Sequence, residues 1–308
     1  MSAAKITGEK IWLDGQLIDW DDARIHVLSH TLHYGLGVFE GICSYKTHDD
    51  RSAIFRLREH VRRLFDSAHI NLLEIPYTIE QVEEAILETL KANNLTAGYI
   101  RPLVFLGEGA MGINPANNAV RLAIIAWPWG AYLGEDGMKN GIRAKVSTFS
   151  RHHINSKMTN GKTCGDYVNS ILAKREALLD GFDEAIMLDT QGLISEATGA
   201  NIFVVRDGAI RTPQAHTILA GITRDTVMQL AADQGLSLVE TTLTRDDLYI
   251  ADEVFLCGTA AEVTPVRELD HRKIGSGGRG PITEQIQAAY FDVVQGKNAK
   301  FIDYLTYL

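Results

Sequence analysis

The sequence predicts an α/β fold of α+β character in two domains. At 308 residues the chain is longer than a single hydrophobic core usually supports. Hairpin signals are mixed with helical patterns, without the strict alternation of a doubly wound parallel sheet. Residues 128–138 are rich in Gly and aromatics and lack periodicity. We therefore expect a small α+β domain at 1–127, an interdomain loop at 128–138 and a large domain at 139–308.

Local signals predict a hairpin, four strands and two helices in the first half. Asp14-Gly15 stands between two short apolar runs, which is typical of a tight hairpin turn. Thr78 and Gln81 have the spacing of a capping box at a helix start. The strands are expected at 38–45, 53–57, 99–106 and 120–127, and the helices at 59–73 and 78–94.

The second half is expected to contain a long irregular loop, a second Asp-Gly hairpin and three helices. The loop covers 151–164, and the hairpin turns at Asp207-Gly208. The helices are expected at 166–179, 223–234 and 281–294, and the strands at 143–148, 184–188, 202–205, 209–210, 237–241 and 253–256. Clefts between domains are where small ligands usually bind.

The composition favours small-molecule partners. The formal net charge is −9 and the pI is near 5.6, whereas nucleic-acid binders present a basic patch to phosphates. No run approaches the roughly 18 apolar residues of a membrane span, and the first ten residues lack the apolar core of a signal peptide. Three cysteines without a CxxC pair indicate no disulfide framework and no zinc site. We expect a cytoplasmic protein that binds no metal, nucleic acid or membrane.

Two glycine-rich segments match G-x-G-x-x-G, the spacing of dinucleotide-binding turns. Residues 107–112 follow a strand, but Asn114-Pro115 breaks the chain and no helix follows to face a pyrophosphate. Residues 275–280 precede a helix, but too little chain remains to complete a βαβ half. Both segments are predicted to be connecting loops.

Lys162 lies between glycines immediately before a helix, in the run Asn-Gly-Lys-Thr-Cys-Gly-Asp-Tyr of residues 160–167. The backbone there can approach a ligand closely, although a loop lysine is usually only a solvated charge. A lysine that binds pyridoxal phosphate covalently also needs a carboxylate for the ring nitrogen and a cradle for the phosphate.

Candidates for both groups lie downstream. Glu196 stands where an apolar strand ends in a turn, which would aim it into a pocket; the alternative is an exposed turn acid. Gly221 and Thr223 open a helix whose N–H groups and hydroxyl suit an anion, although plain N-capping by Thr223 is equally good locally. A second Gly-Thr pair, at Thr259, ends another strand.

Together these segments resemble the class IV pyridoxal-phosphate aminotransferases over nearly the whole chain. The residues that fit the family's extended signature are Glu196, Thr198, Asn201, Ile202, Phe203, Ile210, Thr212, Leu219, Gly221, Ile222 and Arg224. The resemblance implies fold type IV, the fold of the D-amino-acid aminotransferases, with the cofactor in the interdomain cleft. The large domain would be the cofactor-binding domain. It implies that Lys162 binds pyridoxal 5'-phosphate covalently, that Glu196 pairs with the ring nitrogen and that Tyr167 hydrogen-bonds the ring hydroxyl oxygen.

The same resemblance assigns the phosphate site. Arg63 looks like the phosphate arginine, assisted by backbone groups of Ile222 and Thr223 and by the Thr259 hydroxyl. The alternative for Arg63 is a surface helix arginine like its neighbour Arg62.

Within the family, residues 34–41, 99–102 and 127–132 resemble the branched-chain amino-acid aminotransferases. Their aromatic residues would wall an apolar pocket for Val, Leu or Ile side chains, and Arg101 would meet the distal carboxylate of glutamate or 2-oxoglutarate. The alternative for aromatics in strands is core packing. The residues expected to bind substrate are Tyr34, Phe39, Tyr99, Arg101, Trp129, Tyr132, Thr259, Ala260 and Ala261. The last three would hold the α-carboxylate through backbone N–H groups, and Tyr99 would add its hydroxyl.

The resemblance implies a transaminase that moves the amino group of L-branched-chain amino acids to 2-oxoglutarate in a ping-pong cycle. It also implies a homodimer or a trimer of dimers. Two departures leave an (R)-amine or D-amino-acid transaminase as the alternative: Cys43 stands where Arg is common, and Ala200 where Glu is common. If the chain is not an enzyme, the alternative is a ligand-binding or scaffold protein that keeps this fold without the cofactor.

Overall fold

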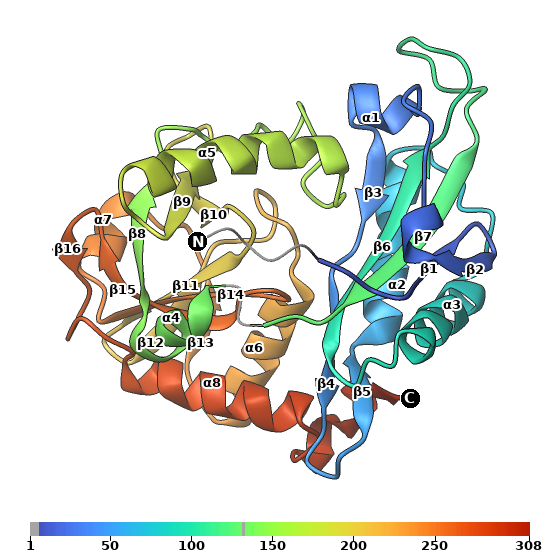
Figure 1. Cartoon of the computed structure of the whole chain (residues 1–308). Helices are drawn as coiled ribbons and strands as arrows, with labels where there is room; N and C mark the ends of the chain where they lie inside the picture. Colours follow the sequence, from blue (N-terminus) through green and yellow to red (C-terminus); the bar gives the residue numbers. More distant parts are fainter. Residues whose placement is uncertain (1–5, 131–132) are drawn as a thin grey trace. The chain divides into compact units, whose positions relative to one another are not determined.

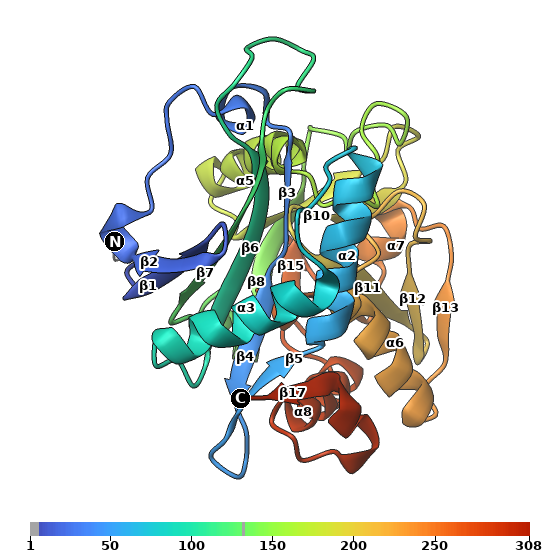
Figure 2. The same cartoon turned by 90° about the vertical axis from the view of Figure 1, so that its right-hand side faces the viewer.

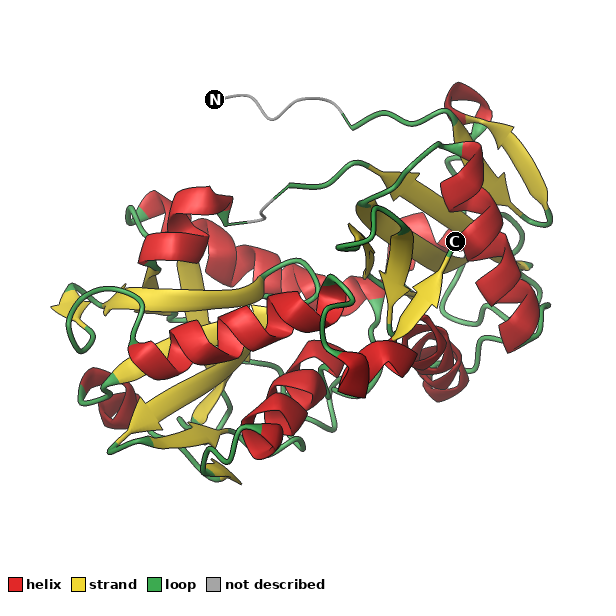
Figure 3. Cartoon of the chain, turned by 90° about the horizontal axis from the view of Figure 1, so that it is seen from below, coloured by secondary structure: helices red, strands yellow, loops and turns green. Residues whose placement is uncertain are grey.

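The computed structural model describes residues 6–130 and 133–308, which form two compact units of mixed helix and sheet (Figures 1 and 3). Unit 1 comprises the described residues of Met1–Gly130, together with Gly161–Asp166 and Val293–Leu308. Unit 2 comprises the described residues of Ala131–Asn160, together with Tyr167–Asp292. The mixture of helices and sheets confirms the predicted fold class, whereas the domain bounds stay a prediction.

Unit 1 is built on an antiparallel sheet, which has eight strands in the described part of the chain. Its order is β17-β5-β4-β6-β7-β1-β2, with β3 beside β6. The strands are β1 (Lys10–Leu13), β2 (Gln16–Asp19), β3 (Gly37–Phe39), β4 (Ile42–Lys46), β5 (Ser52–Phe55), β6 (Gly98–Leu106), β7 (Val120–Trp127) and β17 (Leu305–Tyr307). The predicted β1–β2 hairpin is confirmed, and Asp14 and Gly15 both have positive φ, 48° and 95°, as its tight turn requires.

Two helices, α2 (Leu57–Ile70) and α3 (Ile79–Ala92), cover one face of this sheet (Figure 2). The predicted capping box starts α3: the Gln81 backbone N–H donates to Thr78 Oγ1, and the Thr78 N–H donates to Gln81 Oε1. Leu64 and Ile86 are fully buried among the strand residues that these helices cover. Shorter helices are η1 (Trp20–Asp22), α1 (His30–Tyr34) and η3 (Ala299–Tyr304).

Unit 2 is built on a mixed sheet of nine strands among the described residues. Its order is β10-β9-β8-β15-β14-β11-β12-β13, with β16 beside β15. The strands are β8 (Ile142–Val146), β9 (Glu184–Leu188), β10 (Ile194–Ala197), β11 (Asn201–Arg206), β12 (Ala209–Thr212), β13 (Leu238–Glu240), β14 (Glu253–Gly258), β15 (Glu262–Leu269) and β16 (Arg272–Lys273). The helices that accompany them are α4 (Gly134–Asn140), α5 (Tyr167–Leu179), α6 (Ile222–Asp233), α7 (Arg245–Tyr249) and α8 (Pro281–Val294). The short helix η2 (Cys164–Asp166) precedes α5 in the chain but belongs to unit 1. Small residues let α5 pack closely on β9, where Ala173 and Ala177 meet Ala185 and Met187.

The structure differs from the predicted elements where a short strand or helix depends on distant residues. The strand predicted at 38–45 is two strands, because Glu40 and Gly41 interrupt it and the Glu40 N–H donates to Pro102 O. The helix α4 begins inside the segment predicted as a loop. The two glycine-rich segments, residues 107–112 and 275–280, are loops, as predicted. Within the described residues, no helix combines the length and apolarity needed to cross a membrane.

Candidate active site

Lys162 is held beside β3 in unit 1 by its own backbone. The Lys162 N–H donates to Ser67 Oγ at 3.0 Å, and the Lys162 carbonyl accepts from the Phe39 N–H at 3.1 Å. The next residue, Thr163, forms an isolated β-bridge with Val38. Both sides of the lysine are therefore fixed to packed elements, β3 and α2, although the surrounding segment is irregular.

The ring of Phe39 brings the lysine and an arginine together. Lys162 Nζ lies 5.1 Å from the ring centroid, and the guanidinium carbon of Arg101 lies 4.5 Å from it. Arg101 Nη2 donates to the Tyr99 hydroxyl at 3.3 Å, but its buried Nε has no hydrogen-bond partner among the described residues. Because buried donors are normally satisfied, this guanidinium is suited to a ligand carboxylate.

Aromatic rings extend this surface of unit 1. Tyr99 packs on Trp127 and Trp129, with centroid distances of 5.2 and 4.9 Å. Trp127 on β7 lies directly opposite Tyr99 on β6 in the strand register. It was not among the predicted site residues. Tyr34 ends α1 and contacts His30 at 4.6 Å between centroids, and Tyr132 lies outside the described residues. The alternative of core packing thus holds in part for Tyr99, which is buried and at the same time contacts Arg101.

Glu196 lies in β10 of unit 2 and is buried, so the alternative of an exposed turn acid is wrong. Its Oε1 is 2.8 Å from Arg151 Nη2, and its Oε2 accepts from Asn201 Nδ2 and from the Leu219 N–H, both at 3.2 Å. A carboxylate that is oriented and charge-balanced in this way suits a protonated ring nitrogen. Arg151 was missed because only its position at the start of the irregular loop marks it in the sequence.

Other residues of the signature hold the backbone around Glu196. Asn201 Nδ2 also donates to Leu219 O at 3.0 Å, and Thr212 Oγ1 donates to Ile202 O at 2.9 Å. Arg224 Nη2 donates to Pro213 O at 2.9 Å. These residues therefore position the segment that leads into α6.

The first turn of α6 is suited to an anion. Its N-cap is Gly221, which has no side chain that could accept from the first N–H groups. Thr223 lies inside the helix, and the alternative of N-capping by Thr223 is wrong. A glycine is required at the cap because a Cβ atom there would lie 2.0 Å from Asn201 Oδ1.

The remaining predicted residues lie on both units. Arg63 is on α2 and is largely buried against Glu40, so it is not a surface arginine, whereas Arg62 is exposed. Tyr167 is the first residue of α5. Thr259, Ala260 and Ala261 form the tight turn between β14 and β15.

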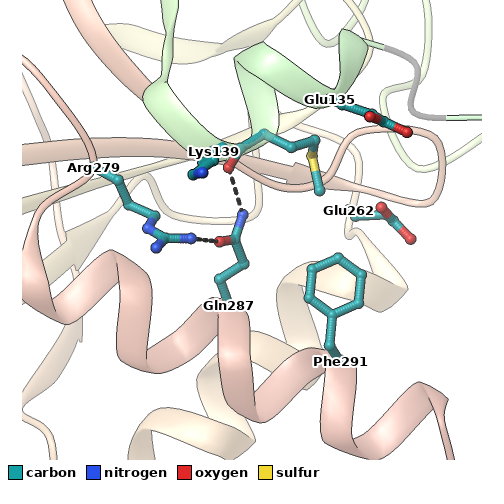
Figure 4. Close-up of a pocket in the computed structure, with 7 residues that line it drawn as sticks. Glu135, Lys139, Glu262, Arg279, Gln287 and Phe291 are labelled. Carbon is teal, nitrogen blue, oxygen red and sulfur yellow. Dashed lines mark hydrogen bonds between the residues drawn. The ribbon is translucent and has the colours of Figure 1, made fainter.

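A separate cavity of about 300 Å³ lies in unit 2 beside α4 and α8 (Figure 4). Its lining consists of Glu135, Met138, Lys139, Glu262, Arg279, Gln287 and Phe291. The Gln287 amide donates to Met138 O and Val263 O and accepts from Arg279, which also pairs with Glu284. These contacts link α8 to the β14–β15 side of the sheet, and no predicted site residue lines the cavity.

The chain matches the family model "Amino-transferase class IV" over residues 37–269. It is 52% identical over 296 residues to the branched-chain-amino-acid aminotransferase of Pseudomonas aeruginosa, with 96% of each chain covered. It is 45% identical over 289 residues to the enzyme of that name from Escherichia coli, with 93% of each covered.

Solved structures agree with these relatives. The crystal structure of the Escherichia coli branched-chain amino acid aminotransferase matches with a TM-score of 0.95 at 44% identity, covering 97% of this chain and 99% of that one. The enzyme of that name from Thermobaculum terrenum, in its PLP-form, matches with a TM-score of 0.92 at 32% identity, covering 98% and 99%. The chain therefore belongs to the class IV aminotransferases and, within them, to the branched-chain amino-acid aminotransferases.

Proposed function

We propose that this chain is a branched-chain-amino-acid transaminase. It transfers the amino group of L-leucine, L-isoleucine or L-valine to 2-oxoglutarate in a ping-pong cycle and uses pyridoxal 5'-phosphate. The observation that carries this proposal is the arrangement around Phe39, where the amine of Lys162 and the guanidinium of Arg101 approach one ring. An apolar wall with a carboxylate-binding cation beside it suits both a branched-chain amino acid and glutamate.

The residues of the chain fit the cofactor. The Lys162 amine would bind it covalently, Glu196 would hold a proton on the ring nitrogen, and Tyr167 would donate to the ring hydroxyl oxygen. The phosphate would be bound by Arg63, Ile222, Thr223 and Thr259. When bound, pyridoxal phosphate acts as an electron sink that weakens the bond between the substrate's Cα and its hydrogen. Once the substrate's amino group has displaced it from the cofactor, the freed Lys162 amine would take the proton from Cα as general base.

We assign the substrate contacts as follows. The apolar side chain would contact the aromatic wall, and Arg101 would bind the distal carboxylate of glutamate and 2-oxoglutarate. The α-carboxylate would be bound by the backbone at Ala260 and Ala261. The wall comprises Tyr34, Phe39, Tyr99, Trp129 and Tyr132, and Thr259 completes the α-carboxylate turn.

Steady-state rates test the substrate assignment. We expect kcat/KM to be higher for L-leucine and L-valine than for D-alanine or (R)-1-phenylethylamine; the reverse order would establish the alternative (R)-amine or D-amino-acid transaminase. Arg101→Met should reduce kcat/KM for glutamate by about 100-fold, because one buried charge-assisted pair is lost. The same variant should change kcat/KM for leucine much less, and an equal loss for both substrates would contradict the role of Arg101.

We further propose a cytoplasmic homodimer, or a trimer of dimers. Exposed apolar side chains along α5 support a self-association surface in unit 2: Val168, Ile171, Leu172, Leu178 and Leu179. In unit 1, Val27 and Leu32 are also exposed. The molar mass of the protein, measured by light scattering as it elutes from a size-exclusion column, tests this proposal. The mass of a monomer at micromolar concentration would contradict it.

A further inference from the structure

Glu40 is a fully buried acid between β3 and β4 of unit 1, with no exposed side-chain surface. Its two carboxylate oxygens accept from Arg63 Nε at 2.6 Å and from Arg63 Nη2 at 2.9 Å, which is a bidentate pair. It also accepts from His60 Nδ1 at 2.7 Å and from the Gly41 N–H at 3.2 Å. One carboxylate therefore holds two side chains of α2 at once.

The charges of this network balance. Burial alone would raise the pKa of Glu40, but Arg63 and His60 outweigh burial and hold that pKa well below its ordinary value. Burial lowers the pKa of His60, so at neutral pH the imidazole is uncharged and donates a neutral N–H. The nearby Lys162 also lowers the pKa of His60, which brings the network within electrostatic reach of the lysine.

Held in this way, the guanidinium of Arg63 has a fixed plane. A free arginine loses rotamer freedom when it binds an anion, and an arginine already ordered by the fold loses less. Its neighbour Arg62 is exposed and lies on the same helix, so the order of Arg63 does not come from the helix alone. The fixing contacts come from Glu40, which reaches α2 from the sheet.

We infer that Glu40, with His60, is the positioning residue that orders Arg63 for the phosphate of the cofactor. This inference rests on the proposed function, in which Arg63 binds that phosphate. In Glu40→Gln the side chain keeps its size but presents an amide N–H₂ to the donors of Arg63, so the bidentate pair is lost. We expect the affinity for pyridoxal phosphate to fall about tenfold, the share of binding that comes from ordering one long side chain.

The test compares two ligands that differ only in the phosphate. The apoproteins of the wild type, Glu40→Gln and Arg63→Met are titrated with pyridoxal phosphate and with pyridoxal, and the dissociation constants are measured by absorbance. Glu59→Gln is the matched control, because Glu59 is also on α2 and pairs with Arg56 but is more than a third exposed. In Glu40→Gln, the affinity for pyridoxal phosphate is expected to fall while the affinity for pyridoxal stays at the wild-type value. In Glu59→Gln, both affinities are expected to stay at the wild-type values.

The outcomes separate the inference from the proposed function. If Arg63→Met loses the preference for pyridoxal phosphate and Glu40→Gln keeps it, Glu40 does not position Arg63 and the inference is overturned. If Arg63→Met itself keeps that preference, Arg63 does not bind the phosphate and both fail. If Glu40→Gln does not fold, Glu40→Asp, which keeps the charge on a shorter stem, takes its place with the same two ligands. In the Arg63→Met background, the Glu40 substitution is expected to change the preference no further.

Discussion

Replacing Glu196 by glutamine should destabilise unit 2 and remove most of the turnover. Arg151 Nη2 lies 2.8 Å from Glu196 Oε1, and the two side chains are only 12% and 7% exposed. Removing one partner of a buried pair costs about 3–5 kcal/mol. Because the glutamine oxygen can still accept one hydrogen bond, for example from the Leu219 N–H, we expect about 3 kcal/mol. In the proposed site Glu196 holds the proton on the ring nitrogen, so loss of its carboxylate should lower kcat by about 100-fold or more.

The free energy of unfolding is best measured by calorimetry, because all four tryptophans lie in unit 1 and their fluorescence would miss the change. Glu268→Gln is the matched control: Arg143 Nη2 lies 2.8 Å from Glu268 Oε1, but these side chains are 32% and 28% exposed. This more exposed pair should cost less than about 1 kcal/mol. Equal destabilisation by the two substitutions, together with near-normal turnover of Glu196→Gln, would refute the reasoning.

Three further predictions concern single side chains. Gly221→Ala places a Cβ atom 2.0 Å from Asn201 Oδ1, so the free energy of unfolding should fall by about 1–3 kcal/mol; an unchanged calorimetric transition would contradict the close approach. Burial raises the pKa of the Cys164 thiol to about 11, so iodoacetamide at pH 8 should label it far more slowly than in the unfolded chain; labelling at the unfolded rate, by mass spectrometry, would count against this. Burial lowers the pKa of His60 below its ordinary value of 6.5. As the pH falls, His60 is therefore protonated in the unfolded state before it is protonated in the folded state. Stability should therefore fall as pH drops below about 6.5, and His60→Asn should show a smaller fall in thermal midpoint between pH 7 and 5.

The sequence predicted best those features that depend on neighbouring residues. The turn at Asp14-Gly15 and the capping box at Thr78 are set by side chains within three residues of each other, so their local pattern is sufficient. The loop around Lys162 was predicted correctly as irregular. Its attachment to unit 1 was not, because the bridge between Val38 and Thr163 joins segments far apart in the chain.

The same reason accounts for the residues that were missed. Arg151 carries no local signature, and Glu40, although it lies in the segment 34–41, was given no role of its own. Each acquires its importance only when the fold brings a charge of opposite sign against it. The strand β17 likewise depends on its antiparallel pairing with β5, which is distant in the chain. The roles of the predicted site residues stay predictions, but the structure brings Phe39, Arg101 and Lys162 together within one unit.

The most direct measurement of the central claim is the visible absorbance of the purified protein during sequential addition of L-leucine and 2-oxoglutarate. We predict a cofactor band that bleaches with L-leucine and returns with 2-oxoglutarate, because the two half-reactions share one site. A band that ignores L-leucine but bleaches with D-alanine or an (R)-amine would overturn the substrate assignment. No band, even after addition of pyridoxal phosphate, would contradict the account as a whole.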